Sequence, residues 1–503
     1  MSKKYNILVN AITNYGRDIL DVAVFLYLIP FIIHTLGKET FGLWSLVWAF
    51  VSVFALLDFG FGPSVVKYVG KARGEQDPAQ EQKAISTLFW IYIVLGSILF
   101  LSVATCAFFF NSLFDIPEHQ QQTARHVLLI LGFRAALCMP LELFRGVLIS
   151  YHQYKIANSY KIVGSILYLI GAIVFLNYAP NLQTLALVNA AIGILPLFAM
   201  FIHLKIFYKN ISIHPRNIDL SMVKSMSSFS IYFFIIQVST LIYTRVDTLI
   251  IQKYLSLEMV ALYSIAMRIT DKAQRFCTQI AKTLTPVISE LHGAKQKQKL
   301  TKVWLQGSKY TTAFSAPLLI GLFILSEPII TSWAGHDFAN ATLSCQILIV
   351  AIFITIIHSN TNIILSMCDQ QKYFAKITIF GQILNFVLSI VFIGLWSIEG
   401  VALATLASTA ITYILFIQSK ACAIYEMNIF RFYAKSCGPS LLPSIILIMF
   451  LYIVQFLYPA SNLWLVAIYE CSALLIYIVA FTRYSLDDSE KKYVATKLSK
   501  FKR

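Results

Sequence analysis

Charged residues are scarce in this sequence, and their scarcity is the first constraint on its structure. Asp, Glu, Lys and Arg together make up 13% of the 503 residues, whereas hydrophobic residues make up 58%. A soluble domain contains about 25% charged residues, and no part of this chain has that composition. The composition therefore predicts an all-α polytopic membrane protein.

The motifs of common enzymes are also absent. The chain has no Walker A motif, no nucleophile elbow and no extramembrane segment large enough for a nucleotide-sugar site. Its nine histidines show no HExxH spacing, and its eight scattered cysteines form no CxxC pair. We therefore predict no metal, no cofactor and no enzymatic activity.

Apolar runs long enough to cross a bilayer recur along the whole chain. A helix of about twenty residues covers the hydrocarbon core. This length selects about fourteen spans, which lie at 16–36, 42–62, 85–110, 126–148, 162–179, 184–206, 229–251, 259–285, 308–330, 342–366, 377–397, 400–419, 438–458 and 463–482.

Positive charge is concentrated in alternate connections between these spans. The opening MSKKYNIL shows no signal-peptide pattern, so the first span is expected to be retained and to follow a cytoplasmic N-terminus. Even-numbered connections then hold most lysines, for example Lys155 and Lys295, whereas the opposite connections offer little beyond Lys38 and Lys253. The positive-inside rule therefore predicts two cytoplasmic termini. The net charge of +16 needs no nucleic-acid partner, although the basic tail could contact anionic membrane lipids.

An internal repeat indicates how the spans are grouped. The segment Ile32 to Leu46, IIHTLGKETFGLWSL, aligns with Ile250 to Ile265, IIQKYLSLEMVALYSI, and the alignment pairs Glu39 with Glu258. Each copy lies at the outer turn between the first two spans of a six-span unit, which implies a parallel repeat of about 215 residues. The alternative is a chance match between segments of common membrane composition.

The repeat predicts a four-part chain. Residues 1–206 and 229–420 would each form a six-helix bundle, residues 207–228 a cytoplasmic linker, and residues 421–503 two further helices with a basic tail. Paired bundles with a cavity between them are the architecture of alternating-access transporters.

The eighth predicted span carries the most unusual charge pattern. One arc of roughly 100° on its helical wheel contains Arg268, Asp271, Lys272, Arg275, Gln279 and Lys282. A cation at mid-bilayer costs about 2.5–3.5 kcal/mol, so this arc is expected to line a water-filled cavity, and its cations favour an anionic substrate. The alternative is a helix that leaves the bilayer near Arg268 and continues as an interfacial amphipathic segment.

Other ionisable residues occur within predicted spans and are candidates for the same cavity. Arginine offers a planar donor fork to phosphate oxygens, and a buried carboxylate can carry a proton. Arg245 is a second candidate contact for the substrate; the candidates for ion coupling or a polar lumen are Asn14, Arg17, Asp21, Asp247 and Asp271. Glu142 and Arg145 are three residues apart and are expected to form a structural pair along one helix.

Two segments resemble a known family. LGKETFGLWSLVWAFVSVFALLDFGFGPSVVKYVGKARGEQD, Leu36 to Asp77, resembles the opening of bacterial polysaccharide-unit flippases of the Wzx type. RVDTLIIQKYLSLEMVALYSIAMRITD, Arg245 to Asp271, is similar to the start of their second half. These flippases belong to the multidrug, oligosaccharidyl-lipid and polysaccharide exporter superfamily.

The resemblance implies a fold, a substrate and partners. It implies a V-shaped pair of six-helix bundles, related by a pseudo-twofold axis, in the bacterial inner membrane. Its substrate would be an undecaprenyl-pyrophosphate-linked oligosaccharide, flipped to the periplasmic leaflet for O-antigen, lipopolysaccharide or capsule-like polysaccharide. A polysaccharide polymerase and a chain-length regulator would be partners. Arg268, Lys272 and Arg275 would contact phosphate or acidic sugar.

Two other functions remain open at this stage. An ion-coupled drug or metabolite antiporter of the same superfamily would have a cavity dominated by carboxylates, whereas the predicted cavity has an excess of cations. A membrane polymerase or ligase would present a large outer loop. The longest outer connection here, Asn111 to Arg125, is short.

Overall fold

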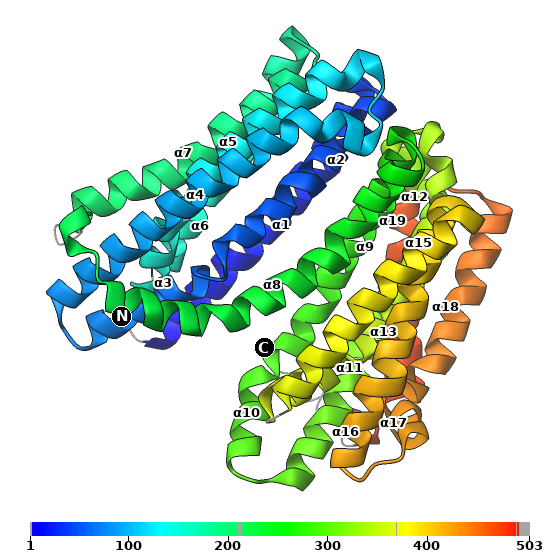
Figure 1. The fold of residues 1–503 in the computed structure, drawn as a ribbon. Helices are drawn as coiled ribbons and strands as arrows, with labels where there is room; N and C mark the ends of the chain where they lie inside the picture. The colour runs from blue at the N-terminus through cyan, green and yellow to red at the C-terminus, as the bar shows by residue number, and fades with distance from the viewer. Residues whose placement is uncertain (1–2, 152, 209–212, 369, 489, 492–503) are drawn as a thin grey trace. The chain divides into compact units, whose positions relative to one another are not determined.

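The computed structural model describes residues 3–151, 153–208, 213–368, 370–488 and 490–491. All regular secondary structure in these residues is helical, which confirms the all-α prediction (Figure 1). Contacts between Cα atoms divide the chain into two compact units, residues 1–261 and residues 262–503.

The first unit contains eight α-helices and two short 3₁₀ helices among its described residues. In chain order these are α1 (Lys3–Leu36), α2 (Lys38–Phe54), η1 (Ala55–Asp58), α3 (Gly62–Gly74), α4 (Pro78–Phe114), α5 (Glu118–Ser150), α6 (Tyr154–Tyr178), α7 (Leu182–Phe207), η2 (Pro215–Asn217) and α8 (Leu220–Tyr254).

Short polar signals set the ends of these helices. The Asp77 carboxylate accepts a hydrogen bond from the backbone N–H of Gln80 at 3.0 Å, and Pro78 occupies the first position of α4. The Asn181 side chain caps α7 in the same way through Thr184. Such caps satisfy N–H groups that have no partner within the helix.

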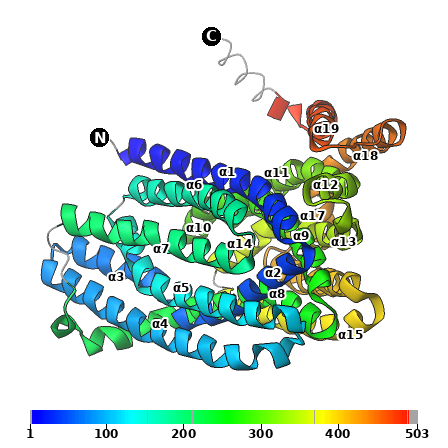
Figure 2. The same ribbon diagram turned by 90° about the horizontal axis from the view of Figure 1, so that it is seen from above.

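Helix α5 is central to the first unit. It packs on α4, α7 and α3, while α6 packs between α7 and α1 (Figure 2). The hydrophobic core beside it includes Leu88, Phe144, Val147 and Met200, all 1% exposed or less. Helix α8 belongs to this unit through contacts with α2, α4 and α3.

The second unit begins within α9 (Leu257–Thr283) and contains all later elements. These are α10 (Thr285–Gly293), α11 (Lys297–Ile324), α12 (Ser326–Ala334), η3 (His336–Ala341), α13 (Thr342–Ile357), α14 (Ser359–Met367), α15 (Gln371–Ala410), η4 (Ile411–Gln418, a π-helix), α16 (Ser419–Ile424), α17 (Ile429–Ser436), α18 (Gly438–Leu457) and α19 (Leu463–Tyr484).

Buried hydrogen bonds join helices within the second unit. The indole N–H of Trp304 donates to the Thr361 hydroxyl at 3.0 Å, and that hydroxyl donates to the Gln418 side chain at 2.9 Å. The three residues come from α11, α14 and η4. Polar groups buried away from water need such partners, so these bonds specify how the three elements pack.

Two long helical stretches are interrupted. Helices α11 and α12 meet at Leu325 with a bend of 67°. Within α15 the backbone leaves the helical region at Trp396 and Ser397, and Ser397 has a φ of +53°. This second break coincides with the predicted boundary between the spans 377–397 and 400–419.

Every predicted span lies mainly on helix, although several spans, including 42–62, 308–330 and 342–366, cross a short break, and the number of spans stays a prediction. Nine of the helices in the described ranges are long and apolar enough to cross a membrane, or ten if α11 and α12 form one bent span. Helix α15 and its continuation to Ile424 are counted as one of these nine helices, although they cover two predicted spans. The chain is thus a multi-pass membrane protein.

The predicted four-part division also stays a prediction. It placed residues 229–420 in a second bundle, whereas contacts between Cα atoms group α8 with the first unit. The two copies of the proposed repeat both form a helix–turn–helix, α1–α2 and α8–α9. These two turns are in contact, because a Cβ added at Gly42 would lie 1.9 Å from the carbonyl oxygen of Leu257.

Candidate functional site

Helix α9 has one buried face and one charged face. Val260, Ala266 and Ala273 are 6% exposed or less, whereas Arg275 and Lys282 are exposed. The sequence contains an apolar residue every three or four positions, so tertiary packing covers only one side of the helix. The charged arc predicted from the sequence therefore lies on a continuous helix.

Three charged residues occupy one turn in the middle of this arc. Arg268, Asp271 and Lys272 are half-buried, and each takes part in a polar or electrostatic interaction. Their spacing of three and four residues places them on one helix face. Two cations beside one carboxylate leave a net positive charge, which suits an anionic group.

The predicted polar face of α1 is described only in part. Asp21 is half-buried, and its Oδ1 accepts a hydrogen bond from the Ser165 hydroxyl of α6 at 2.8 Å. Asn14 and Arg17 lie in α1, and their side chains are outside the described residues. Of the residues predicted on this face, Asp21 is therefore the one whose side-chain contacts are described.

Helix α8 holds the remaining predicted residues. Asp247 is 2% exposed, whereas the side chain of Arg245 lies outside the described residues. Near the end of α8, Lys253 pairs with Asp115 at 3.3 Å, and the Gln252 side chain donates to the carbonyl of Phe114 at 2.8 Å. These contacts join the ends of α8 and α4.

A cationic cluster in the first unit extends the predicted pair of Glu142 and Arg145. The two side chains form an ion pair, as predicted. Lys161 of α6 also approaches Glu142 at 3.3 Å, and the three side chains remain 35–38% exposed. Lys161 was not predicted as a partner, because it is nineteen residues away on another helix.

Arg134 of α5 occupies a second cationic position in the same unit. Its guanidinium carbon lies 5.1 Å from the centre of the Trp48 ring. A Cβ added at Gly193 would lie 2.4 Å from its Nε atom, so the absence of a side chain at Gly193 makes room for the guanidinium. A cation over an indole face is stabilised by the negative charge of the ring face.

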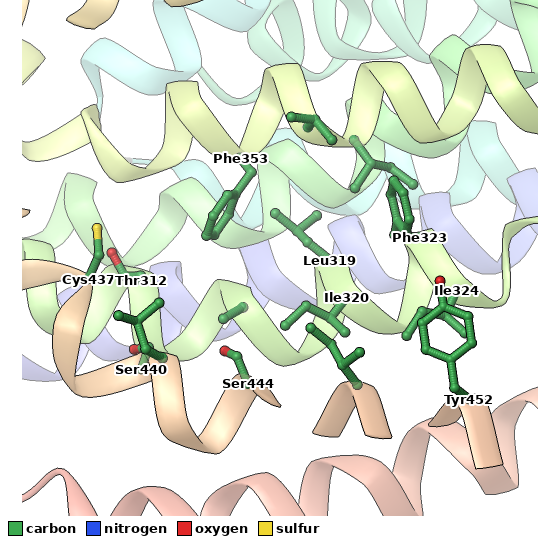
Figure 3. A pocket seen from close by; sticks show the side chains of 15 residues that line it. Thr312, Leu319, Ile320, Phe323, Ile324, Phe353, Cys437, Ser440, Ser444 and Tyr452 are labelled. Atoms are coloured by element: carbon green, nitrogen blue, oxygen red, sulfur yellow. The ribbon is translucent and has the colours of Figure 1, made fainter. Parts of the chain in front are cut away.

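An apolar groove lies in the second unit between α11, α13 and α18 (Figure 3). Its volume is about 420 Å³. Leu319, Ile320 and Phe323 of α11 and Phe353 of α13 line one part, and Ser444 of α18 lies opposite. The groove offers hydrocarbon contacts with few polar groups.

A polar cavity of about 750 Å³ lies in the first unit at the α1–α2 turn. Glu39 and Glu258, which the repeat alignment pairs with each other, both line it. His119 approaches Glu39 at 3.5 Å, and the amide side chain of Gln120 is 7% exposed. By the predicted topology this cavity is on the outer side.

The many helices long and apolar enough to cross a membrane define the class of polytopic membrane proteins. The chain belongs to the polysaccharide biosynthesis protein family, whose pattern matches residues 35–343. A probable flippase, AglR of Haloferax volcanii, is 20% identical over 82% of this chain and 83% of its own length. A putative O-antigen transporter of Escherichia coli is 23% identical over 81% of this chain and 94% of its own.

Solved structures show the same fold. The lipid II flippase MurJ in an inward closed conformation aligns with a TM-score of 0.73 at 17% identity, covering 95% of this chain and 98% of MurJ. An inward-facing multidrug resistance MATE family transporter aligns with a TM-score of 0.70 at 15% identity, covering 81% and 99%. The family and its named relatives confirm the predicted polysaccharide transporter in place of an enzyme, and these structures confirm the predicted fold.

Proposed function

We propose that this protein flips a polyprenyl-pyrophosphate-linked oligosaccharide from the cytoplasmic to the outer leaflet of the bacterial inner membrane. The observation that carries the proposal is the half-buried turn of α9 with Arg268, Asp271 and Lys272. Family membership and the names of the relatives, a probable flippase and an O-antigen transporter, support it. Both termini would be cytoplasmic, and a polymerase and a chain-length regulator would act on the product.

The charge of the substrate explains the need for cations within the membrane. A pyrophosphate group keeps its negative charge at neutral pH, and a bare charge in hydrocarbon is strongly unfavourable. Arginine donates to two phosphate oxygens at once, whereas lysine supplies a mobile point charge. In this mechanism Arg268, Lys272, Arg275, Arg245 and Lys282 replace the water around the pyrophosphate during alternating access.

The apolar groove suits the other end of such a substrate. A polyprenyl chain is pure hydrocarbon, and the groove between α11, α13 and α18 is lined mostly by Leu, Ile and Phe side chains. Three of these apolar positions, Leu319, Ile320 and Phe323, lie on one helix. We place the polyprenyl chain in this groove.

The test is leaflet transfer of a labelled polyprenyl-pyrophosphate oligosaccharide in liposomes. The triple variant Arg268→Ala, Lys272→Ala, Arg275→Ala should transfer the substrate at least about tenfold more slowly, because each charge-assisted hydrogen bond contributes about 1.5–3 kcal/mol. The control removes three exposed cations from the polar connection and the start of α11, through Lys295→Ala, Lys299→Ala and Lys302→Ala.

The two variants carry the same change in net charge and separate the possible outcomes. Slow transfer by the α9 variant alone, with a wild-type unfolding temperature, supports the proposal. Transfer at the wild-type rate by both variants would mean that the charged arc lies outside the transport path. This is the result expected if α9 were an interfacial helix. Absence of transfer by the wild-type protein would contradict the flippase function.

The fold likeness to MATE transporters keeps a drug or metabolite antiporter as the second candidate. Such a protein would rely on the carboxylates of Asp21, Asp247 or Asp271 for ion coupling. Resistance to cationic dyes that is lost in Asp21→Asn or Asp247→Asn cells would favour this function over the flippase.

A further inference from the structure

Glu470 places a carboxyl group inside a membrane-spanning helix of the second unit. It lies in α19, which packs on α18, α11 and α12. Val466, Ala473 and Tyr477 lie four residues before it and three and seven after it, on the same helix face, and all three are buried. Glu470 therefore points toward the interior of a hydrophobic cluster.

The carboxyl group occupies a notch in α11. A Cβ added at Gly321 would lie 1.7 Å from Oε2 and 2.6 Å from Oε1 of Glu470. The Oε2 atom is fully buried, and no hydrogen-bond partner for it occurs within the described ranges. The glycine thus leaves the space that the carboxyl group fills, without supplying a polar partner.

The notch adjoins the break between α11 and α12. The backbone N–H of Leu325 donates to the carbonyl of Gly321 at 2.8 Å, and this is the last helical hydrogen bond before the bend of 67°. Glu470 therefore lies against the final turn of an interrupted span. Broken helices at membrane depth are places where the backbone can change direction during transport.

No charged group balances this carboxyl among the residues that the structure describes. On α11 the nearest titratable side chains are Lys309 and Tyr310, and the nearer of the two lies about 16 Å along the helix from Gly321. Both of these side chains contact Glu490. On α12 Glu327 is exposed, and on α18 Tyr452 is 56% exposed.

The tyrosines of α19 do not balance it either. Tyr469 donates to the carbonyl of Tyr458, and Tyr477 lies two helical turns away from Glu470. Among the described residues, none of these helices supplies a hydrogen-bond partner for the buried Oε2 atom of Glu470.

We propose that Glu470 is a proton-binding site that controls the contact between α19 and α11. An ionised carboxylate in the notch would be an uncompensated buried charge, so the docked side chain is the neutral acid. When α19 separates from Gly321, the carboxyl releases its proton to water and no other bond changes. A proton thus stabilises one arrangement of the break at Leu325.

The proton site is independent of the substrate, but its use in coupling rests on the proposed flippase function. Proton binding favours the docked arrangement, and ionisation favours the separated one. The docked arrangement would therefore be favoured when Glu470 exchanges protons with the more acidic side of the membrane. The separated arrangement would be favoured when it exchanges protons with the more alkaline side. Coupling of transfer to a proton gradient would follow.

The first experiment measures protonation directly in the wild-type protein. Dicyclohexylcarbodiimide modifies protonated carboxyl groups in apolar surroundings, and mass spectrometry locates the modified residue. We expect modification of Glu470 at neutral pH that declines as the pH rises, with no modification of the exposed Glu327. Absence of modification at Glu470, or equal modification of Glu327, would overturn the proposal.

The second experiment follows unfolding in detergent as a function of pH. Because the folded state holds a proton that the unfolded state releases, the ratio of folded to unfolded protein should fall by up to about tenfold per pH unit above about pH 5, and the fall should end once the folded carboxyl itself ionises. The Glu470→Gln variant should lack this decline, and Glu327→Gln should keep it. The same decline in Glu470→Gln would contradict the assignment.

A transfer assay separates this proposal from the flippase function. With a pH gradient across the liposome, wild-type transfer should accelerate, whereas Glu470→Gln should transfer at one rate with or without the gradient. If neither the wild type nor Glu470→Gln transfers the substrate, the flippase function is contradicted. The modification and unfolding experiments then still test whether Glu470 binds a proton. If wild type and Glu470→Gln respond equally to the gradient, Glu470 does not couple it.

Discussion

At the scale of single residues, three glycines make room for a group from another helix. Gly42 allows α2 to meet the backbone at Leu257, Gly193 accommodates Arg134, and Gly321 accommodates Glu470. Any larger residue at these positions would have to displace backbone or a polar side chain. Small residues at helix contacts therefore set which polar groups can enter the membrane interior.

Gly42 provides a prediction at this scale. The Gly42→Ala variant should lower the free energy of unfolding by about 1–3 kcal/mol, because the methyl group would overlap the Leu257 carbonyl. The control is Gly70→Ala in α3, where an added Cβ meets nothing within 4 Å, so it should be neutral or stabilising by up to about 1 kcal/mol. Unfolding curves in detergent measure both. Equal stability of the two variants would mean that α2 shifts freely.

At the scale of elements, the segment after α19 returns to α11. Glu490 accepts hydrogen bonds from the Lys309 ammonium at 2.7 Å and from the Tyr310 hydroxyl at 2.6 Å. Burial opposes ionisation of Glu490, but these hydrogen bonds outweigh it and hold its pKa below the ordinary value of 4.5. The Ser485 hydroxyl also donates to the carbonyl of Pro439.

This contact has a defined pH dependence. A carboxyl with a lowered pKa in the folded state stabilises that state above its ordinary pKa and loses the effect as the pH falls through the lowered value. The segment from Ser485 to Lys491 should therefore stay protected from protease at neutral pH and become cleavable as the pH falls below the ordinary carboxyl pKa of 4.5.

Variants of this segment test whether Glu490 causes the pH-dependent protection from protease. Glu490→Gln should expose the segment at every pH and cost on the order of 3 kcal/mol, because it leaves Lys309 buried without its partner. Asp488→Asn, at an exposed position, should behave like the wild type. Protection that is independent of pH in the wild type would rule out Glu490 as the anchor.

At the scale of the whole molecule, both units are helical bundles whose cores are apolar and whose charges are sorted by position. In the first unit the turns at Gly37 and Asp115 lie at one end of their helices, and the connection at Gln76 lies at the other. The positive-inside rule predicts that the Gln76 end is cytoplasmic.

Labelling of engineered cysteines tests that orientation. In intact cells a membrane-impermeant thiol reagent should modify Gln122→Cys at the outer end of α5, and it should modify Ala79→Cys at the start of α4 only after permeabilisation. Both positions are exposed. The native exposed thiol, Cys471, is removed first in both. Modification of Ala79→Cys in intact cells would reverse the predicted topology.

The helices, the membrane class and the break at Trp396–Ser397 were predictable from the sequence alone. Each depends on residues close together in the chain: apolar runs, capping residues and loops rich in lysine. The pair of Glu142 and Arg145 was predictable for the same reason, since the two residues are one helical turn apart.

The contacts between helices were not predictable in this way. Lys161 joins Glu142, Glu490 joins Lys309, and Glu470 meets Gly321 across separations that leave no periodic trace in the sequence. The sequence by itself thus determined that this is a cationic, helical membrane protein, because hydropathy and charge act locally. Tertiary structure alone decided which buried charges gain partners and which, like Glu470, must be neutralised by a proton, because partners depend on how helices pack.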